Sequence, residues 1–306
     1  MAEKKIPEMK YLKRNLLNNM LGKVAKGIGG FYYVKFNNEI IRGQGRGILK
    51  RNNNLIKVGD NVEFELRDDK QCVITKVCKR KNEFIRPSIA NIDRIIVTFA
   101  ATEPNPSFLS IDKLCAIAEY YQVSVYICIT KIDLVDENRF NEIINVYNSI
   151  YKTFNVNAKS GYGIDELMKG IQGQTVALAG PSGVGKSTIL NALLNNNKAE
   201  TGSLSSKTKR GRHTTRHAEI FDVDYKTSVF DTPGFTSLDM PIMEVSDLTS
   251  LFPDFVKYCN CKYRDCIHIN EPSCGVKESL SKGFISRSRY QSYIRMIEEI
   301  KSNKKY

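Results

Sequence analysis

A stretch near the middle of the chain, GPSGVGKST at residues 180–188, has the residue types and spacing of a phosphate-binding loop. It matches G-x-x-x-x-G-K-[ST] and lies between the apolar run QTVALA, a predicted strand, and a predicted helix. Glycines let the backbone curl so that N–H groups point at phosphate oxygens, while Lys186 would reach the β- and γ-phosphates and Ser187 would bind Mg²⁺. The pattern predicts a nucleoside triphosphate site with one magnesium ion. Its expected nucleotide-binding residues are Gly180, Pro181, Ser182, Gly183, Val184, Gly185, Lys186, Ser187 and Thr188.

The motif TKID at residues 130–133 follows the apolar run VSVYIC and is typical of a guanine reader at the end of a strand. Asp133 would accept hydrogen bonds from N1–H and the amino group of guanine, a pair of donors that adenine lacks. Lys131 would lay its methylene stem along the base. The usual form is Asn-Lys-x-Asp, and here Thr130 replaces an amide that would brace the phosphate loop, which could loosen base binding.

A second motif, NAKSG at residues 157–161, resembles the loop whose backbone N–H, here that of Ala158, meets guanine O6. Either match alone is weak, but two on consecutive strand ends favour GTP or GDP over adenine nucleotides. The residues expected at the base are Thr130, Lys131, Ile132, Asp133, Ala158 and Lys159.

Two further stretches are candidates for switches that sense the γ-phosphate. DTPGF at residues 231–235 closes a predicted strand, where Asp231 would hold magnesium through water and the Gly234 N–H would meet the γ-phosphate. Upstream, GRHTTRHAE offers Thr214 and Thr215, of which Thr215 is the preferred magnesium ligand although spacing does not decide.

The order of these motifs is that of a guanine-nucleotide domain cut and rejoined elsewhere, because the base reader precedes the phosphate loop. The strands of such a sheet can keep their places while the chain ends move. The segment after Gly234 then leads directly into the C-terminal region, so loss of the γ-phosphate should be felt there first.

We expect Lys186, Thr215 and Gly234 to take part in catalysis. Ras-like enzymes place a water-orienting Gln directly after D-x-x-G, and here that position is Phe235, which predicts slow intrinsic hydrolysis that a partner accelerates. His213 is a candidate for positioning water, or else a loop histidine that contacts phosphate, RNA or solvent.

Four of the eight cysteines crowd into the stretch CNCKYRDCIHINEPSC. Three thiolates and one imidazole form a closed tetrahedral set that suits a structural zinc ion. Cys259 is a rival for Cys261, which we prefer. The expected zinc ligands are Cys261, Cys266, His268 and Cys274.

The pattern of apolar runs predicts a multidomain chain. An N-terminal extension at 1–21 precedes short strands at 22–82 that suit a small β-barrel, either an oligonucleotide-binding (OB) barrel or an SH3-like one. Strands and helices then alternate over 83–245, as in an α/β phosphate-loop domain of circularly permuted order. Residues 246–306 form a small, α-rich zinc-binding domain with a C-terminal helix.

Positive charge is concentrated at both ends of the 306-residue chain, whose net charge is +13. Residues 1–90 carry 20 Lys or Arg against 9 Asp or Glu, residues 91–245 carry 15 against 17, and residues 246–306 carry 11 against 7. This distribution fits a nucleic-acid surface or a solvated, Lys-rich one. The basic residues of the terminal helix, which we slightly favour as RNA contacts, are Arg287, Arg289, Arg295 and Lys301.

Composition excludes some classes of protein. A hydrophobic content of 42% suffices for packed cores, and no apolar run approaches the length that spans a bilayer. The N-terminus lacks the apolar core of a signal peptide, so we expect a cytoplasmic protein without membrane contact.

The ordered set TKID, GPSGVGKST, GRHTT, DTPGF and CKYRDCIH…C resembles the RsgA/YjeQ family of circularly permuted bacterial GTPases, over roughly residues 20–275. The resemblance implies an OB barrel, GTP hydrolysis stimulated by the small (30S) ribosomal subunit late in its maturation, and contact with ribosomal RNA through the flanking domains. We also expect a monomer. Thr130 departs from the commonest form of the family, and guanine affinity is the property that this departure would change.

Two other functions compete with this interpretation. The first is a phosphate-loop ATPase or small-molecule kinase, against which Asp133 and the DTPG strand argue. The second is a zinc RNA-binding protein that keeps nucleotide as a structural prop, for which Phe235 argues.

Overall fold

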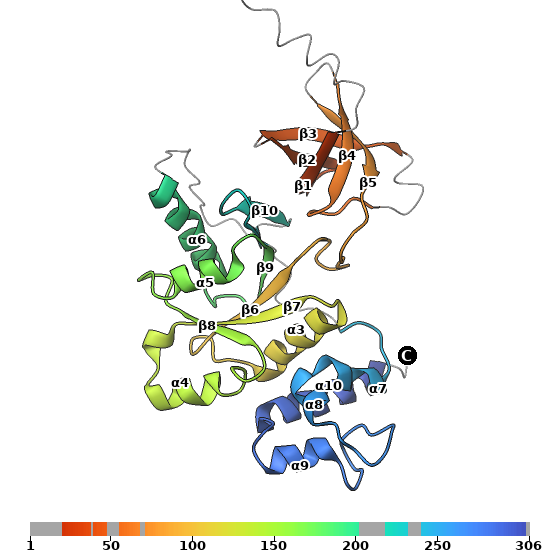
Figure 1. The fold of residues 1–306 in the computed structure, drawn as a ribbon, viewed down its shortest axis with the longest axis vertical. Helices are drawn as coiled ribbons and strands as arrows, with labels where there is room; N and C mark the ends of the chain where they lie inside the picture. The colour runs from red at the N-terminus through yellow and green to blue at the C-terminus, as the bar shows by residue number, and fades with distance from the viewer. Residues whose placement is uncertain are drawn as a thin grey trace, which may run out of the picture. The chain divides into compact units, whose positions relative to one another are not determined.

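The computed structural model describes residues 20–37, 39–47, 55–67, 71–201, 218–231 and 240–303, with the backbone alone described at 196–201 and 303. Contacts divide the chain into two units (Figure 1). One comprises Met1–Ile92 with Thr214–Phe221, and the other comprises Asp93–His213 with Asp222–Tyr306. Among the described residues, no helix has the length and apolar character needed to cross a bilayer.

The first unit is built on a five-stranded barrel. Its strands are β1 (Met20–Ile28), β2 (Phe31–Phe36), β3 (Glu39–Gly45), β4 (Asn61–Leu66) and β5 (Cys72–Val77). Strand β1 pairs with both β2 and β4, while β3 pairs with β5 in parallel, so the order β1-β2-β3-β5-β4 closes on itself. This is the OB connectivity, which pattern alone did not separate from an SH3-like barrel.

Alternating side chains fill the barrel. The fully buried ones are Val24, Val34, Val62, Phe64, Cys72 and Ile74. A strand from far along the chain, β10 (Glu219–Asp222), joins this unit by pairing with β1, where Lys26 Nζ lies 2.9 Å from Glu219 Oε2.

The second unit contains a parallel sheet of five strands. They are β6 (Arg94–Ala100), β7 (Ser124–Thr130), β8 (Lys152–Val156), β9 (Thr175–Ala179) and β11 (Ser228–Asp231), in the order β11-β9-β6-β7-β8. The central strands β6 and β9 are almost continuously buried, as expected when helices cover both faces. Their carboxyl ends lie at one edge, so TKID after β7, NAKSG after β8, GPSGVGKST after β9 and Asp231 at the end of β11 share that edge.

Helices connect these strands. They are α3 (Phe108–Tyr120), α4 (Glu137–Ile144), α5 (Ile164–Ile171) and α6 (Lys186–Thr201), with a short 3-10 turn, η1 (Ile132–Leu134), inside the TKID motif. Side chains cap two of them at the N-terminus: the Ser107 hydroxyl accepts from Ser110 N, and the Asp136 carboxylate accepts from Arg139 N.

A small helical region completes the second unit. Its elements are α7 (Val245–Leu248), η2 (Thr249–Leu251), α8 (Pro253–Tyr258), α9 (Gly275–Ser281) and α10 (Arg287–Asn303). Helix α10 packs on α3, and their shared core includes Ala116, Phe252, Phe255 and Tyr293.

Arg289 of α10 lies inside this core rather than on the surface. Only 1% of it is exposed, and its guanidinium donates to Asp254 of α8 (2.6 and 2.9 Å) and to Asp112 of α3 (2.7 Å). The prediction that this arginine contacts RNA is therefore wrong. Its sequence position on a basic helix gave no sign of the two buried carboxylates to which it donates.

Candidate functional site

The phosphate-loop motif forms a tight turn between β9 and α6. Gly180, Gly183 and Gly185 have φ angles of 141°, 79° and 99°, which side chains disfavour. At Gly180 a Cβ would also overlap the carbonyl oxygen of Thr98 in β6. The loop therefore has the backbone that its glycines predict, and it ends at the N-terminus of α6, where helix dipole and free N–H groups favour an anion.

Lys186 points back into the loop. Its Nζ donates to the carbonyl oxygens of Gly180 (2.7 Å) and Pro181 (2.6 Å). Burial lowers the pKa of Lys186, and the negative charge of Asp231 opposes that effect. A phosphate in the curl of the loop would replace these two carbonyls as the partner of the ammonium group.

Thr130 links the base-reading motif to the phosphate loop. It is 5% exposed, and its hydroxyl lies 2.7 Å from the carbonyl oxygen of Val184 and 3.2 Å from that of Phe99. Because a hydroxyl has one proton, the shorter contact to Val184 is the better donor geometry. The threonine thus makes the brace between β7 and the loop that we assigned to the missing asparagine amide.

The rest of TKID turns sharply at the end of β7. Lys131 has a left-handed backbone (φ 54°), and its Nζ contacts the carbonyl oxygen of Glu103 in the loop after β6. Asp133 follows in η1 with its side chain exposed, available to a base at this edge.

The NAKSG loop is held by its own first residue. The Asn157 carboxamide oxygen accepts from the backbone N–H groups of Lys159 (3.2 Å) and Ser160 (3.4 Å), which fixes the turn around Ala158. Gly163, at φ 75°, closes the loop before α5 begins at Ile164.

Asp231 ends β11, the strand beside the phosphate-loop strand, with Phe230 paired to Ala177. It is the one expected magnesium ligand besides Ser187 that falls in the described part of the chain. His213, Thr214, Thr215, Gly234 and Phe235 lie outside the described residues.

The sequence analysis did not predict that β6 and the loop after it contribute to this edge of the sheet. The loop ATEPNPS after β6 supplies the Glu103 carbonyl to Lys131, and β6 supplies the Thr98 carbonyl beside Gly180. The available signal was the polar, Pro-containing loop at the end of a buried strand, since β6 lies between the two strands that carry the motifs.

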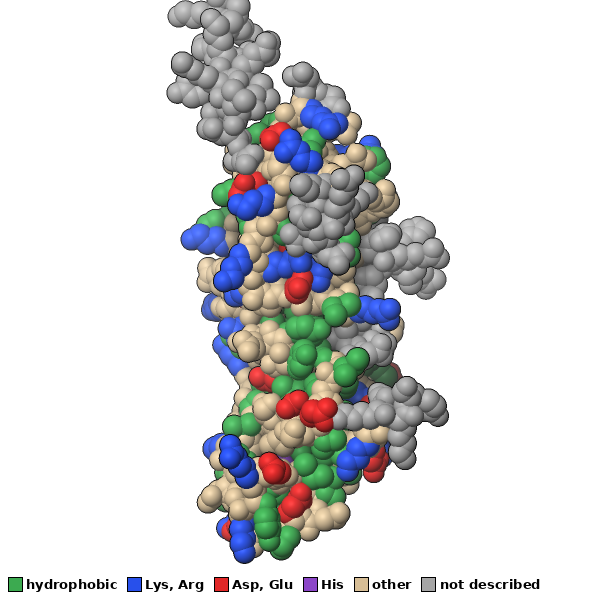
Figure 2. Space-filling model, turned by 90° about the vertical axis from the view of Figure 1, so that its right-hand side faces the viewer, with side chains coloured by type: hydrophobic (Ala, Val, Ile, Leu, Met, Phe, Trp, Pro, Cys, Tyr) green, Lys and Arg blue, Asp and Glu red, His purple; other side chains and the backbone are tan. Residues whose placement is uncertain are grey.

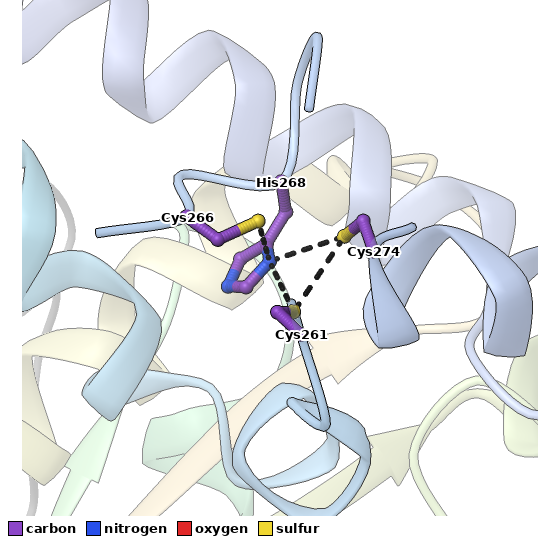
Figure 3. A group of neighbouring side chains, drawn as sticks. All are labelled: Cys261, Cys266, His268 and Cys274. Atoms are coloured by element: carbon purple, nitrogen blue, oxygen red, sulfur yellow. Dashed lines mark hydrogen bonds between the residues drawn. The ribbon is translucent and has the colours of Figure 1, made fainter. Parts of the chain in front are cut away.

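The expected zinc ligands converge in space (Figure 3). His268 Nδ1 lies 3.3 Å from the sulfurs of Cys266 and Cys274 and 3.5 Å from that of Cys261. The sulfurs of Cys261 and Cys274 are 3.8 Å apart. Tetrahedral zinc with ordinary bond lengths separates two sulfurs by about 3.8 Å and a sulfur from a nitrogen by about 3.5 Å. The four side chains could therefore hold zinc.

The chemistry of the cluster also suits a cation. Burial lowers the pKa of His268 and so favours the neutral imidazole that a metal needs. Burial raises the pKa of Cys266 to about 12, so its thiolate would require a neighbouring positive charge. Cys259 is exposed and its Sγ faces the Val256 carbonyl (3.1 Å), outside the group of four.

Comparisons with known proteins agree with this architecture. The family model described as RsgA GTPase matches residues 77–241, and the RsgA N-terminal domain matches residues 21–74. A small ribosomal subunit biogenesis GTPase RsgA of Alkaliphilus metalliredigens is 42% identical over 289 residues, covering 93% of this chain and 99% of the relative. Another protein of the same description, from Agathobacter rectalis, is 41% identical, covering 94% and 100%.

Two solved structures share the fold. YjeQ from Thermotoga maritima is 33% identical with a TM-score of 0.79, over 92% of this chain and 98% of that one. YloQ, described as a circularly permuted GTPase, is 31% identical with a TM-score of 0.77, over 94% and 96%.

Proposed function

The chain belongs to the RsgA GTPase family, a family of GTP hydrolases, and we propose that it acts in maturation of the small ribosomal subunit, in the cytoplasm and as a monomer. The observation that carries the catalytic half is the shared carboxyl edge of β7, β8, β9 and β11. The TKID, NAKSG, GPSGVGKST and DTPG motifs, which are far apart in the sequence, each follow or end one of these strands.

The nucleotide would lie along this edge. We infer that Asp133 and Lys131 receive guanine with the Ala158 N–H at O6, while residues 180–188 enclose the phosphates. Ser187 and Asp231 are the described side chains that would hold magnesium, with Thr215 as the proposed third ligand. Magnesium would neutralise charge that develops on the phosphates.

Coupling to the C-terminal region follows from the chain path. The described chain resumes at Met240, and Met243 and Leu248 are buried in the core cluster that also contains residues of α10. We propose that rearrangement at the γ-phosphate reaches this region through the segment after the DTPG motif. Zinc at Cys261, Cys266, His268 and Cys274 would keep the receiving region rigid.

The ribosomal half of the proposal is supported by the relatives' printed names and by charge. On the face shown in Figure 2, the described Lys and Arg side chains lie in several separate groups among neutral and acidic ones. An RNA surface on that face would thus be a set of phosphate contacts rather than one continuous basic patch.

The test is GTP hydrolysis by the purified chain, alone and with isolated small subunits. We expect slow turnover alone and strong stimulation by the subunits, both abolished by Lys186→Ala. Lys169→Ala, an exposed lysine on α5, is the matched control and should behave like the wild type. If the small subunits do not stimulate turnover while nucleotide binds normally, the proposed role in subunit maturation is contradicted. GTP hydrolysis at this site would still be supported.

A further inference from the structure

A cavity of about 450 Å³ opens in the second unit, and its lining contains none of the predicted nucleotide or zinc ligands. Residues 149 and 150 after α4 form one wall, α8 forms another, and Gly283 and Phe284 after α9 form the third. Its volume falls in the range of pockets that hold small molecules or single residues of a larger ligand.

Phe284 is presented to this cavity on a rigid turn. Helix α9 ends in a Schellman motif, in which Gly283 N donates to the Leu280 carbonyl (3.1 Å) and Phe284 N to that of Ser279 (2.9 Å). Gly283 has the left-handed backbone that this motif requires, with φ 77°. An apolar residue after such a motif usually packs on its own helix, but the Phe284 side chain is 60% exposed.

The Phe284 ring stacks on the ring of Tyr258. The ring lies parallel to that of Tyr258, with an interplanar angle of 16° and centroids 5.8 Å apart. The remaining exposed area of the ring offers a flat apolar platform. Nucleobases bind such platforms because every base has a π face.

The charges around the cavity favour an anion. Lys257 lies on its wall, 5.2 Å from the Tyr258 ring, and makes no ion pair with any carboxylate in the described part of the chain. Asp254 also lines the cavity, but it is 6% exposed and both of its oxygens accept from Arg289 (2.6 and 2.9 Å). A bound phosphate would thus meet the cation of Lys257, while the Asp254 carboxylate is hydrogen-bonded to Arg289.

We propose that this cavity binds one unpaired nucleotide of single-stranded RNA, with its base stacked on Phe284 and its phosphate at Lys257. A nucleotide uses both features, since its base can stack on the exposed ring and its phosphate can pair with Lys257. The inference rests on the proposed function only for placing the chain beside ribosomal RNA in the cell.

The chain contains no tryptophan, so one introduced indole reports on its own site. The experiment uses the full-length Phe284→Trp variant, titrated with a ten-nucleotide adenosine RNA while its emission is followed. We expect saturable quenching by base stacking. Tyr120→Trp, an exposed aromatic position on α3 outside the lining of this cavity, is the matched control and should not respond.

A second substitution tests the phosphate contact. Adding Lys257→Gln to the Phe284→Trp variant should weaken the quenching and lower the slope of log affinity against log salt by about one. Lys282→Gln, an exposed lysine paired with Glu278, should leave both unchanged.

Several results would overturn the proposal. One is steady indole emission from the Phe284→Trp variant while fluorescence anisotropy shows that the labelled RNA still binds the chain. Equal quenching by free AMP at the same concentration would assign the cavity to soluble nucleotides. A response to ribosomal proteins freed of RNA, but not to the oligonucleotide, would assign it to a protein segment. None of these measurements depends on stimulated GTP hydrolysis. A failure of this proposal can therefore be told apart from a failure of the proposed function.

Discussion

The phosphate loop and the cysteine-histidine cluster are two ligand sites in one unit, and they are built in opposite ways. The loop is open: Ser182, Gly183 and Ser187 are exposed, and Lys186 satisfies its ammonium group on the loop's own carbonyls. The cluster is enclosed: His268 is 2% exposed and Cys274 is 5% exposed.

The open loop suits a ligand that exchanges, and the enclosed cluster suits a ligand that stays bound. Groups that bind an exchanging nucleotide need partners when the nucleotide is absent, and the loop supplies them. Three thiolates beside a buried imidazole repel one another without a cation, so we expect the cluster to need a permanently bound one. The comparison predicts that loss of ligand leaves the nucleotide edge folded and disrupts the helical region.

The largest effect should follow removal of the metal. We expect the wild-type chain to carry one zinc ion, and Cys274→Ala to lose it together with cooperative unfolding of α8–α10, since structural zinc contributes about 10–16 kcal/mol to small folds. Zinc content by mass spectrometry and thermal unfolding are the measurements. Cys259→Ala should retain both metal and stability, and equal losses in the two variants would refute the assignment of Cys261 over Cys259.

The buried ion triad comes next. Arg289→Ala leaves the carboxylates of Asp112 and Asp254 uncompensated in the core and should lower the free energy of unfolding by about 3–5 kcal/mol. Chemical denaturation measures this, with exposed Arg287→Ala on the same helix as a control of near-zero effect. Equal stability of the two variants would show that the triad does not hold α10 against α3.

A smaller effect is expected from loss of the hydrogen bond between the Thr130 hydroxyl and the Val184 carbonyl oxygen. Thr130→Val keeps the shape but removes the hydroxyl, leaving the Val184 carbonyl without this donor at a cost of about 1–3 kcal/mol. GDP affinity by calorimetry should fall accordingly while Thr130→Ser stays near the wild type. Thr153→Val, whose hydroxyl faces the Tyr151 carbonyl, is the control. An unchanged affinity for Thr130→Val would mean that the brace is irrelevant to the base.

Local pattern predicted what depends on local chemistry. Glycine spacing identified the loop because only glycine adopts its backbone, and Cys-His spacing identified the cluster because zinc fixes its ligand types. Motif order identified the permuted sheet, because each motif follows a strand.

The sequence pattern did not predict contacts between residues far apart in the chain. Nothing near Arg289 indicated that its partners lie 35 and 177 residues away, and nothing near Glu219 indicated pairing with β1. The boundaries 1–21, 22–82, 83–245 and 246–306 stay a prediction, as do the roles of the individual site residues.

The central claim is that Asp133 reads guanine at this edge. Asp133→Asn exchanges a carboxylate acceptor for an amide that can donate, which matches the extra carbonyl of xanthine instead of the amino group of guanine. The decisive measurement is the affinity of wild type and variant for GDP, ADP and xanthosine diphosphate. We predict that the variant loses GDP affinity and gains xanthosine diphosphate affinity, with ADP weak throughout. Unchanged GDP affinity in the variant, or ADP binding as tight as GDP in the wild type, would contradict the account.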